Sequence, residues 1–523
     1  MSGWDNIGAS HGKSHDKMIQ YGTAGFRCNA DLLEHVIYRM GMLAVLRSQV
    51  KQGQSIGVMI TASHNPGHDN GVKLVDPAGE MLEQEWESVA TGLANCADDQ
   101  LTLELDKIVT RYNIDRSAAS HVVVGRDTRV SSPALARACV DGVSAVGGKC
   151  QDIGLVTTPQ LHYVVVCINT QGGYGDPTLT GYYTKLSSAF NKFMSLVPDK
   201  GAYNNKVVFD GANGVGAVSM KEFLPLLSSS LSVQVTNTGE EAGAELNSGC
   251  GADYVKVKQA APLGMTLSPG VRHVSVDGDA DRVVYYFSDD KFHLLDGDRI
   301  ATLLAGHIKH LLALSGLSSD IKLGLVQTAY ANGSSTAYIR DNLGVPVSCV
   351  PTGVKHLHHE ALKYDIGVYF EANGHGTVVF SDHAVKMIKE KGGDKLSTLL
   401  DVINMTVGDA ISDMLTVEAV LADKGWDCGQ WLECYQDLPN KLAKVMVRDR
   451  TLVTTTDAER RVVTPPGLQE KIDSIVASVK QGRSFVRPSG TEDCVRVYAE
   501  AASHEEAEQL SARVSEVVVS MLG

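Results

Sequence analysis

The sequence predicts a multidomain α/β protein, and three observations support that prediction. Its 523 residues exceed what one hydrophobic core usually serves and suggest about three or four domains of ordinary size. Hydrophobic residues make up 43% of the chain and charged residues 21%, which supplies enough apolar surface for sizeable cores. Short β-rich runs repeatedly end in a polar loop with Gly or Asp and then give way to helical periodicity, which is typical of α/β layers.

Five strands of this kind follow one another along the chain. Each is an apolar, largely β-branched run, and each is followed by turn-forming or polar residues. Functional groups in α/β units gather on the loops beyond the carboxyl ends of the strands, so these loops predict a shared cleft. The strands and their loops are SIGVMI before TASHNP (55–66), HVVVG before RDTR (121–129), KVVFD before GANGVG (206–216), KLGLVQT before AYANGSS (322–335) and DIGVYF before EANGHG (365–376).

Turn-forming residues also mark candidate domain boundaries. They cluster at 171–181, near 294–300 and between 389 and 408, which divides the chain into three α/β units and a tail. The predicted domains are therefore 1–175, 176–297, 298–400 and 401–523.

The C-terminal stretch HEEAEQLSARVSEVVVSMLG predicts one amphipathic helix. Acidic residues occupy its first turn, where they favour the positive end of the helix dipole. Its apolar face is expected to contain Leu510, Val514, Val517 and Met521, and to serve packing rather than function.

Charge and cysteine usage narrow the possible partners and compartments. The formal net charge of -14 would repel a polyanion over most of the surface, so nucleic acid and anionic membrane are not expected partners. The N-terminus has no basic stretch followed by an apolar core, and no apolar run reaches the roughly 18 residues of a membrane span. The 10 cysteines are scattered without C-x-x-C spacing, which favours reduced thiols. We expect an intracellular, cytoplasmic protein.

The segment ITASHNPGHDNGVK (60–73) places a serine on a stiff turn. Asn65-Pro66-Gly67 predicts a tight turn directly after Ser63, and Asn70-Gly71 predicts a second turn before Lys73. One interpretation is that Thr61 or Ser63 merely caps a helix or turn after the strand. The other is a covalent nucleophile or phosphate carrier, since several hydrogen-bond donors surround it. An acyl nucleophile is disfavoured because the G-x-S-x-G pattern is absent.

Three carboxylates, Asp277, Asp279 and Asp281, alternate between two β-rich runs in VSVDGDADRVV. Extended spacing puts all three on one side of the loop. Such crowded negative charges repel unless a cation lies between them, and hard oxygen ligands suit Mg²⁺. A solvated acidic turn is the alternative. An EF-hand is excluded because Arg282 and Ser288 stand where that motif needs Gly and Glu.

The segment RPSGTE (487–492), followed by Arg496, predicts a phosphate site. A guanidinium beside a Ser-Gly-Thr turn offers two hydroxyls and backbone N–H groups that can bind a phosphate without a Walker loop, although a plain polar turn is the alternative. GANGVG lacks a nucleotide-loop pattern and predicts a strand-to-helix turn instead. A positioned serine, a magnesium loop and a phosphate site together favour phosphoryl transfer.

At this point four motifs resemble those of the α-D-phosphohexomutase family. TASHNP resembles its phosphoserine loop, DGDADR its magnesium loop, EANGHG its sugar-reading loop and RPSGTE its phosphate-binding loop, and together they extend from residue 61 to residue 492. The resemblance implies a four-domain architecture, with three α/β domains and a smaller C-terminal α+β domain around a central cleft.

Two departures indicate one branch of that family. GTAGFR (22–27) leads directly to TASHNP, and GRDTR (125–129) follows it, whereas the phosphoglucomutase and phosphomannomutase branches have the reverse order. The chain also has Asn373 where those branches have Ser. Both features are similar to the eukaryotic phosphoacetylglucosamine mutase branch, and the amide of Asn373 could serve an acetamido group.

The resemblance implies an activity and its cofactors. The enzyme would reversibly convert N-acetylglucosamine 6-phosphate into N-acetylglucosamine 1-phosphate through a phosphoserine and a 1,6-bisphosphate, in UDP-N-acetylglucosamine biosynthesis. It would need one Mg²⁺ per subunit and a glucose or N-acetylglucosamine 1,6-bisphosphate as phosphorylating primer. Its partner would be a small sugar phosphate, with no nucleic acid or membrane, and it would be a monomer or weak homodimer.

The resemblance also assigns roles by position. Ser63 would carry the phosphate and ligate the metal with the three aspartates. His64 and Lys73 are the further catalytic candidates, although Lys73 could equally be a surface ion pair. Arg27 and Arg126 could shape the cleft floor or pair with its carboxylates. Substrate would be bound by Glu371, Ala372, Asn373, Arg487, Pro488, Ser489, Gly490, Thr491 and Arg496, with Arg27, Arg126, Arg282 and His375 in support.

Two other functions would use some of the same groups. A phosphoserine-forming metal phosphatase would also need Ser63 and the aspartates, but the sugar loop and the second phosphate site would have no purpose in it. A non-catalytic sugar-phosphate sensor would be expected to lose the serine or an aspartate, and both are present.

Overall fold

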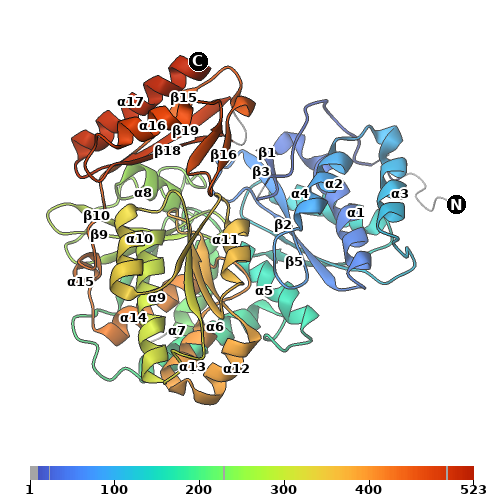
Figure 1. The fold of residues 1–523 in the computed structure, drawn as a ribbon. Coiled ribbons are helices and arrows are strands. Elements are labelled where there is room, and N and C mark those ends of the chain that lie inside the picture. The colour runs from blue at the N-terminus through green and yellow to red at the C-terminus, as the bar shows by residue number, and fades with distance from the viewer. Residues whose placement is uncertain (1–6, 8–9, 23, 228–229, 490–492) are drawn as a thin grey trace. The chain divides into compact units, whose positions relative to one another are not determined.

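A computed structural model describes residues 7, 10–22, 24–227, 230–489 and 493–523, and Figure 1 shows the order of their elements. The chain forms two compact units, each built from separate stretches of sequence. Both contain β-sheets covered by helices, which confirms the predicted α/β class. Unit 1 comprises Met1–Asp296, Asn373–Thr377 and Gly393–Cys428, and unit 2 comprises Gly297–Ala372, Val378–Gly392 and Gly429–Gly523.

The first sheet of unit 1 has the strand order β1-β3-β2-β4-β5. Its central strand β2 (Ser55–Ile60) is buried along its whole length, as expected for an apolar run covered on both faces. Ile56 and Val58 belong to a core shared with four helices, whereas Gly57 faces Val165 of α5. The other elements are β1 (Phe26–Asn29), β3 (Asp69–Val75), β4 (His121–Arg126), β5 (Lys149–Leu155), α1 (Glu34–Val50), α2 (Gln84–Asn95), α3 (Leu101–Arg111), α4 (Ser132–Ala145), α5 (Thr158–Asn169) and the 3-10 turns η1 (Ala30–Leu32) and η2 (Asp98–Gln100).

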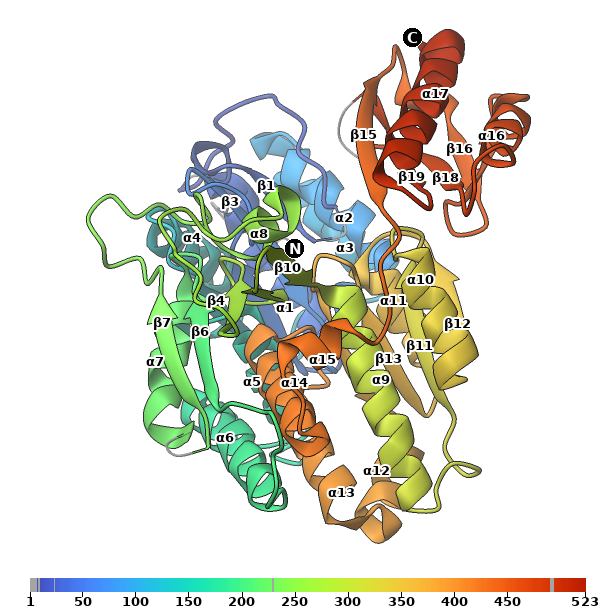
Figure 2. The same cartoon turned by 90° about the vertical axis from the view of Figure 1, so that its left-hand side faces the viewer.

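The second sheet of unit 1 has the order β10-β9-β8-β6-β7. Its antiparallel neighbours β8 (Arg272–Val276) and β9 (Val283–Ser288) are joined by the aspartate loop. GANGVG connects β6 (Lys206–Asp210) to α7 (Val215–Leu227), so the predicted strand-to-helix turn is confirmed. Figure 2 shows α7 beside β7. The remaining elements are β7 (Ser232–Thr236), β10 (Phe292–Leu295), α6 (Leu179–Ser195) and α8 (Ala252–Lys258).

Two later stretches of the chain return to unit 1 and complete the surroundings of the aspartate loop. His375 pairs with Arg282 in an isolated antiparallel bridge. Helix α13 (Gly393–Val402) packs against α6, and α14 (Ala410–Lys424) begins at the loop itself, where the Ala410 N–H donates to Ala280 O at 3.1 Å. The loop is therefore enclosed by residues far from it in sequence.

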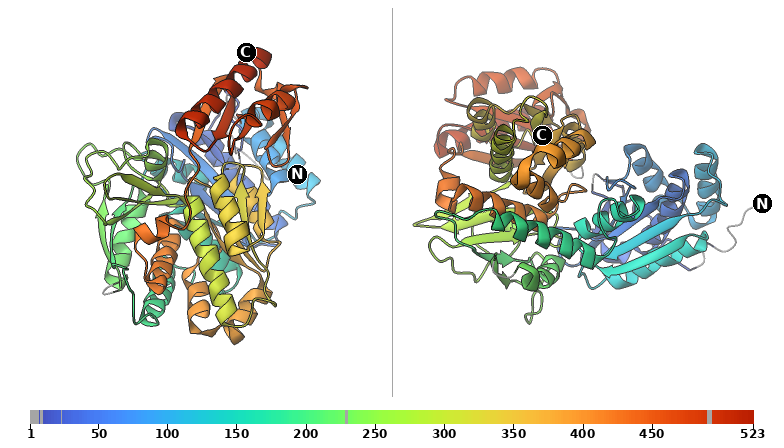
Figure 3. Two further views of the ribbon diagram at one scale, coloured as in Figure 1. Left: turned by 60° about the vertical axis from the view of Figure 1, so that its left-hand side comes forward. Right: turned by 90° about the horizontal axis from the view of Figure 1, so that it is seen from below.

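Unit 2 contains the predicted strands at 322–328 and 365–370, observed as β11 (Leu323–Thr328) and β13 (Ile366–Phe370). They lie in a sheet of order β12-β11-β13-β14. Helix α9 (Gly297–Leu314) runs along the sheet, and α11 (Val354–Ala361) packs on the side that carries Val326 and Tyr369. Figure 3 shows α9 in yellow-green beside these strands. The other elements are β12 (Val347–Val350), β14 (Gly376–Phe380), α10 (Gly333–Ala337), the π-helical η3 (Tyr338–Leu343) and α12 (Asp382–Lys391).

The C-terminal part of unit 2 is a three-stranded antiparallel sheet of order β15-β19-β18, with the hairpin β16-β17 beside it. Two helices, α16 and α17, cover one face of that sheet (Figure 2). Among the described residues, no helix combines the length and apolar character needed to cross a bilayer. The elements are α15 (Cys428–Leu432), β15 (Asn440–Met446), η4 (Arg450–Leu452), β16 (Thr454–Thr456), β17 (Arg461–Thr464), α16 (Leu468–Val476), β18 (Arg483–Pro488), β19 (Cys494–Glu500) and α17 (His504–Leu522).

Helix α17 confirms the predicted C-terminal helix but corrects its apolar face. Leu510 and Val514 are buried as expected. Val517 and Met521 are only partly buried, and Val518 and Leu522 occupy the core instead. In the last two turns of the helix the buried positions therefore lie one residue later than predicted. Spacings of three and four residues both fit a helix face, so the sequence pattern allowed either set.

Candidate active site

Ser63 lies on the turn between β2 and β3, with a left-handed backbone φ of 49°. Few residues other than glycine adopt this conformation, and such strain persists only where the surroundings enforce it. Thr61 braces the turn, because its Oγ1 accepts from the Ser63 N–H at 3.0 Å and donates to Asp127 Oδ2 at 2.7 Å. Of the two residues considered for a capping role, Thr61 fills it.

The Ser63 hydroxyl is held from two sides and is only 1% exposed. Arg27 Nη2 donates to Ser63 Oγ at 3.0 Å. Ser63 Oγ donates in turn to Asp279 Oδ2 at 2.9 Å. The structure thus brings together the serine and the aspartate loop, which are separated by more than 200 positions in the sequence.

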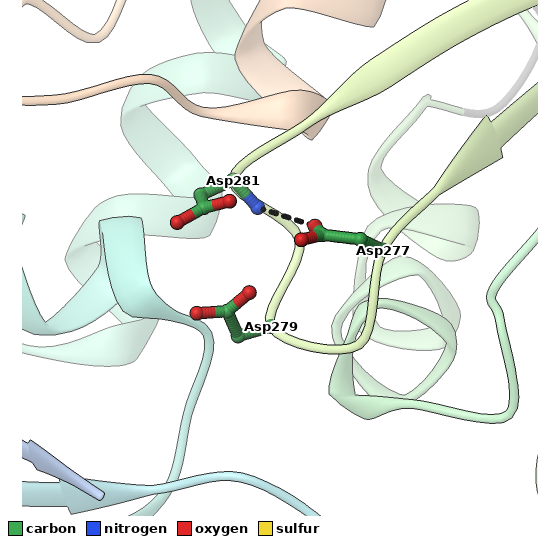
Figure 4. A group of neighbouring side chains, drawn as sticks. All are labelled: Asp277, Asp279 and Asp281. Carbon is green, nitrogen blue, oxygen red and sulfur yellow. Dashed lines mark hydrogen bonds between the residues drawn. The ribbon is translucent and has the colours of Figure 1, made fainter. Parts of the chain in front are cut away.

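The carboxylates of Asp277, Asp279 and Asp281 face one another across the loop between β8 and β9 (Figure 4). All three are buried, and one ligand atom from each lies within 4.8 Å of the others. The Asp281 N–H donates to Asp277 Oδ1 at 3.1 Å, which fixes the loop's curvature. Within the described residues, one oxygen of each carboxylate has no hydrogen-bond partner. These oxygens form a donor set that fits a hard divalent cation.

The electrostatics of the loop also fit a cation. Burial raises the pKa of Asp277 well above its usual range, and the charges of Asp281 and Asp279 raise it further. Burial would raise the pKa of Asp281 as well, but Lys73 and His375 hold it well below its usual range. The neighbours therefore favour the charged form of Asp281 but not that of Asp277, and a divalent ion beside Asp277 would favour its ionised form.

Lys73, on β3, is paired with two of these aspartates. Its Nζ donates to Asp279 Oδ2 at 2.9 Å and to Asp281 Oδ2 at 3.1 Å. Burial tends to lower the Lys73 pKa, but these two carboxylates outweigh it, so the pKa is raised. Lys73 is therefore a buried ammonium group in the site, and the interpretation as a surface ion pair is wrong.

The two candidate histidines lie beside the same loop. His64 Nδ1 is 3.7 Å from Asp253 Oδ2. Burial and the charge of Arg282 lower the pKa of His64 to about 4, which leaves the ring neutral at pH 7. His375 Nδ1 is 3.4 Å from Asp281 Oδ1, and the His375 N–H donates to Asn373 Oδ1 at 3.0 Å.

The three supporting arginines have different partners in the structure. Arg27 contacts Ser63, as described above. Arg282 Nη1 donates to Asp253 Oδ1 at 2.8 Å, and its Nε is 3.8 Å from Asp277 Oδ2. Arg126 pairs instead with Asp152 on the adjacent strand β5, at 3.2 Å. Its carboxylate partner is therefore not one of the three loop aspartates.

Arg129, which sequence reasoning missed, fixes the serine turn. It belongs to the same GRDTR segment as Arg126 but is fully buried on Asp127. Its guanidinium donates to four backbone oxygens of the turn, at distances from 2.5 to 3.0 Å: Ser63 O, Asn65 O, Pro66 O and Asp69 O. The GRDTR motif drew attention to this segment, but nothing in the sequence indicated which of its two arginines would contact the serine turn.

Asn247 and Thr158 were also missed. Asn247 Nδ2 donates to Ser63 O at 2.8 Å and to Asn65 O at 3.0 Å. Thr158 Oγ1 donates to Asp279 Oδ2 at 2.7 Å from the first turn of α5. The T-T-P-Q sequence signals a capping box there, which is present, but it does not indicate the contact with Asp279.

Unit 2 holds the remaining predicted site residues. Glu371 and Ala372 follow β13, and Glu371 Oε1 accepts from the Gly353 N–H at 3.1 Å. Arg487 and Pro488 end β18, and Arg487 lies directly opposite Arg496 on β19. Ser489 is buried, with its N–H donating to Cys494 O at 2.9 Å. Gly490 and Thr491 lie outside the described residues.

Family models match most of the chain. Two are described as phosphoacetylglucosamine mutase AMG1 domains, and two as phosphoglucomutase/phosphomannomutase domains. They account for the four-domain architecture that the sequence motifs predicted. The matches are the α/β/α domain I (33–94 and 91–174), AMG1 domain II (176–284), AMG1 domain III (296–426) and the C-terminal domain (442–517).

Individual proteins match over nearly the whole chain. The phosphoacetylglucosamine mutase of Homo sapiens is 51% identical, over 98% of this chain and 96% of the human protein. A structure of Aspergillus fumigatus N-acetylphosphoglucosamine mutase with GlcNAc-6P and magnesium is 50% identical over 97% of this chain and 96% of that one, with a TM-score of 0.93.

A second Aspergillus fumigatus structure is a serine-to-alanine variant in complex with glucose 1,6-bisphosphate. It is 49% identical over 99% of this chain and 98% of that one, again with a TM-score of 0.93. A sequence identity of about one half over nearly the whole chain, together with the same fold, shows a close relationship. The chain belongs to the phosphoacetylglucosamine mutase family of the α-D-phosphohexomutases.

Proposed function

We propose that this chain reversibly converts N-acetylglucosamine 6-phosphate into N-acetylglucosamine 1-phosphate through phosphorylated Ser63 and a 1,6-bisphosphate. The observation that carries the proposal is the contact of Ser63 Oγ with Asp279, inside a buried group of three carboxylates. A serine so placed can carry a phosphate next to a metal. The ligands of the Aspergillus fumigatus relatives, GlcNAc-6P with magnesium and glucose 1,6-bisphosphate, support the same reaction.

The three aspartates and an oxygen of phosphorylated Ser63 would hold one Mg²⁺ per subunit. Bound there, the ion would neutralise charge on the phosphoryl group. Arg27 would add a second positive group, since it already donates to Ser63 Oγ. Lys73 offsets the charge of Asp279 and Asp281.

In the first half-reaction the bond between Ser63 Oγ and phosphorus breaks, and a new bond forms between phosphorus and the sugar's free 1-hydroxyl oxygen. The hydroxyl proton passes to a base, for which the neutral ring of His64 is our candidate, and Ser63 Oγ takes up a proton as it leaves. In the second half-reaction the bond between phosphorus and the sugar's 6-oxygen breaks and Ser63 Oγ bonds to that phosphorus. The serine proton passes to the 6-oxygen, which leaves the 1-phosphate product. A glucose or N-acetylglucosamine 1,6-bisphosphate would phosphorylate the resting serine.

Substrate recognition is proposed to divide between the sugar and the distal phosphate. Glu371 and Asn373 would read the sugar, and Asn373 would meet the acetamido oxygen through Nδ2, because its Oδ1 accepts from His375 N–H. The distal phosphate would be bound by Arg487, Pro488, Ser489, Gly490, Thr491 and Arg496.

The decisive experiment is intact-mass analysis before and after incubation with glucose 1,6-bisphosphate and Mg²⁺, followed by turnover of N-acetylglucosamine 6-phosphate. We expect one added phosphate in the native chain, none in Ser63→Ala, and loss of turnover in that variant. Turnover unchanged in Ser63→Ala would refute the proposal. Release of inorganic phosphate without the 1-phosphate product would favour the metal phosphatase instead.

We further propose a cytoplasmic location, a monomeric or weakly dimeric state, and domains at 1–175, 176–297, 298–400 and 401–523. Light scattering across a concentration series would test the oligomeric state. A stable tetramer would contradict it.

A further inference from the structure

Glu459, on the turn between β16 and β17, is an acidic residue in direct contact with the proposed distal phosphate site. Its Oε1 is 3.0 Å from Arg487 Nε, and both side chains are about one-fifth exposed, at 19% and 21%. Its Oε2 accepts from the Thr352 N–H at 2.9 Å and from Thr352 Oγ1 at 2.5 Å. One carboxylate thus joins a strand-end arginine to a loop of the neighbouring sheet.

The turn that presents Glu459 has an unfavourable backbone. Asp457, Ala458 and Glu459 have φ values of 52°, 54° and 67°, so three successive residues other than glycine are left-handed. Such a conformation persists where contacts of the side chains enforce it. Here Arg460 closes the turn on Asp457 at 2.6 Å, and Glu459 is held by Arg487 and Thr352.

Glu459 offsets a row of positive charges. Arg487 lies directly opposite Arg496, and Arg496 lies directly opposite Lys444 on β15, so the three side chains share one face of the sheet. Like charges in such positions repel one another. A carboxylate at Nε fixes the plane of the Arg487 guanidinium, and therefore the direction in which its other nitrogens point.

The loop that binds Glu459 also binds the sugar-reading residue. Thr352 N–H contacts Glu459, and the next residue, Gly353, donates its N–H to Glu371 Oε1 at 3.1 Å. Gly353 has a φ of 127°, which only glycine adopts readily, and it caps α11. Both carboxylates therefore lie at the positive end of this helix.

We propose that Glu459 is a positioning residue for phosphate recognition, and that Thr352 and Gly353 couple its position to that of Glu371. Binding of the distal phosphate and recognition of the sugar are then one cooperative event. The inference rests on the proposed function, because it takes Arg487 and Glu371 as substrate contacts. It assigns no chemical step to Glu459.

The test uses the full-length, phosphorylated protein with N-acetylglucosamine 6-phosphate. We expect Glu459→Gln to raise KM about tenfold while kcat stays within about twofold, because a charged contact that orients Arg487 is lost. Glu470→Gln, a charge change on the exposed side of α16, is the matched control and should change neither value. A KM within twofold of the native value in Glu459→Gln would overturn the inference.

Variants of Thr352 test the coupling through the loop. Thr352→Val removes the hydroxyl and should raise KM as Glu459→Gln does, whereas Thr352→Ser keeps the hydroxyl and should leave KM near the native value. The KM of the double variant Thr352→Val with Glu459→Gln should be no higher than that of either single variant. Strictly multiplicative effects would overturn the coupling. Melting temperatures separate these effects from misfolding. If the native chain fails to turn over this substrate, the proposed function is wrong, and the same variants are then compared for binding of inorganic phosphate.

Discussion

Ser63 is fixed through its backbone as well as through its hydroxyl, which accepts from Arg27. Arg129 and Asn247 both donate to Ser63 O and Asn65 O, from different parts of unit 1. Asn247 lies in the connection between β7 of the second sheet and α8, and Arg129 follows β4 of the first sheet, so the pair ties the serine turn to the sheet that carries the aspartate loop. Under the proposed function, a phosphate on Ser63 would therefore lie next to the three aspartates without further ordering of the turn.

Asn247→Ala should therefore slow phosphoryl transfer without unfolding the protein. Two hydrogen bonds to the turn are lost, and we expect kcat to fall about tenfold with little change in melting temperature. Steady-state kinetics and thermal unfolding on the same preparation would check this. An unchanged kcat would show that the turn is held without Asn247.

Asn373→Ser should shift substrate preference. Under the proposed function, the variant loses the amide donor to the acetamido group, while a serine can still accept from His375 N–H. We expect the ratio of kcat/KM for N-acetylglucosamine 6-phosphate over glucose 6-phosphate to fall about tenfold. A ratio that does not change would remove Asn373 from sugar recognition.

Sequence reasoning singled out the serine and the aspartates that the structure brings together, but not the groups that hold them. Ser63 and the three aspartates could be predicted because alternating carboxylates and a serine on a stiff turn have few structural explanations. Arg129, Asn247 and Glu459 could not, because each binds backbone or another side chain far away in sequence. Such contacts depend on the folded arrangement and leave no local pattern.

At the level of elements, strands were more predictable than helix faces. The five expected strands are present because a fully buried strand needs a short apolar run between turn residues, and each run had both. The face of α17 was shifted because a helix with apolar residues at 514, 517, 518 and 521 offers two neighbouring stripes. Only packing against the three-stranded sheet selects between them.

Val518→Ala on α17 tests that assignment. Val518 is completely buried, so its truncation should reduce the free energy of unfolding by about 1.5–3 kcal/mol. Val517→Ala, on the partly buried edge of the same helix, should cost less than about 1 kcal/mol. Chemical denaturation of both variants would decide the matter, and equal losses would favour the stripe expected from sequence.

At the scale of the whole molecule, buried histidines predict sensitivity to acid. His162 on α5 is 2% exposed, its Nδ1 is 2.7 Å from Gly79 O, and burial lowers its pKa to about 4. In the unfolded chain the same ring takes up a proton near pH 6.5. The unfolded state therefore binds more protons between pH 6.5 and 4, and stability falls as the pH falls through that window.

For His162 alone the expected loss is about 2 kcal/mol at pH 5 relative to pH 7. Thermal unfolding between pH 7 and pH 5 should show a steeper decline for the native chain than for His162→Gln. Parallel declines would mean that His162 does not contribute.

The discontinuity of unit 1 also bears on how the protein is made. Asp281 leaves the ribosome long before His375, which bridges to its neighbour Arg282, and before Ala410, whose N–H binds Ala280. At typical synthesis rates of about 5–20 residues per second, that delay lasts roughly ten seconds. During this interval the nascent acidic loop lacks part of its protein cover, so a cation could meet it while the chain is still growing, and the loop is enclosed only after α14 has been synthesised.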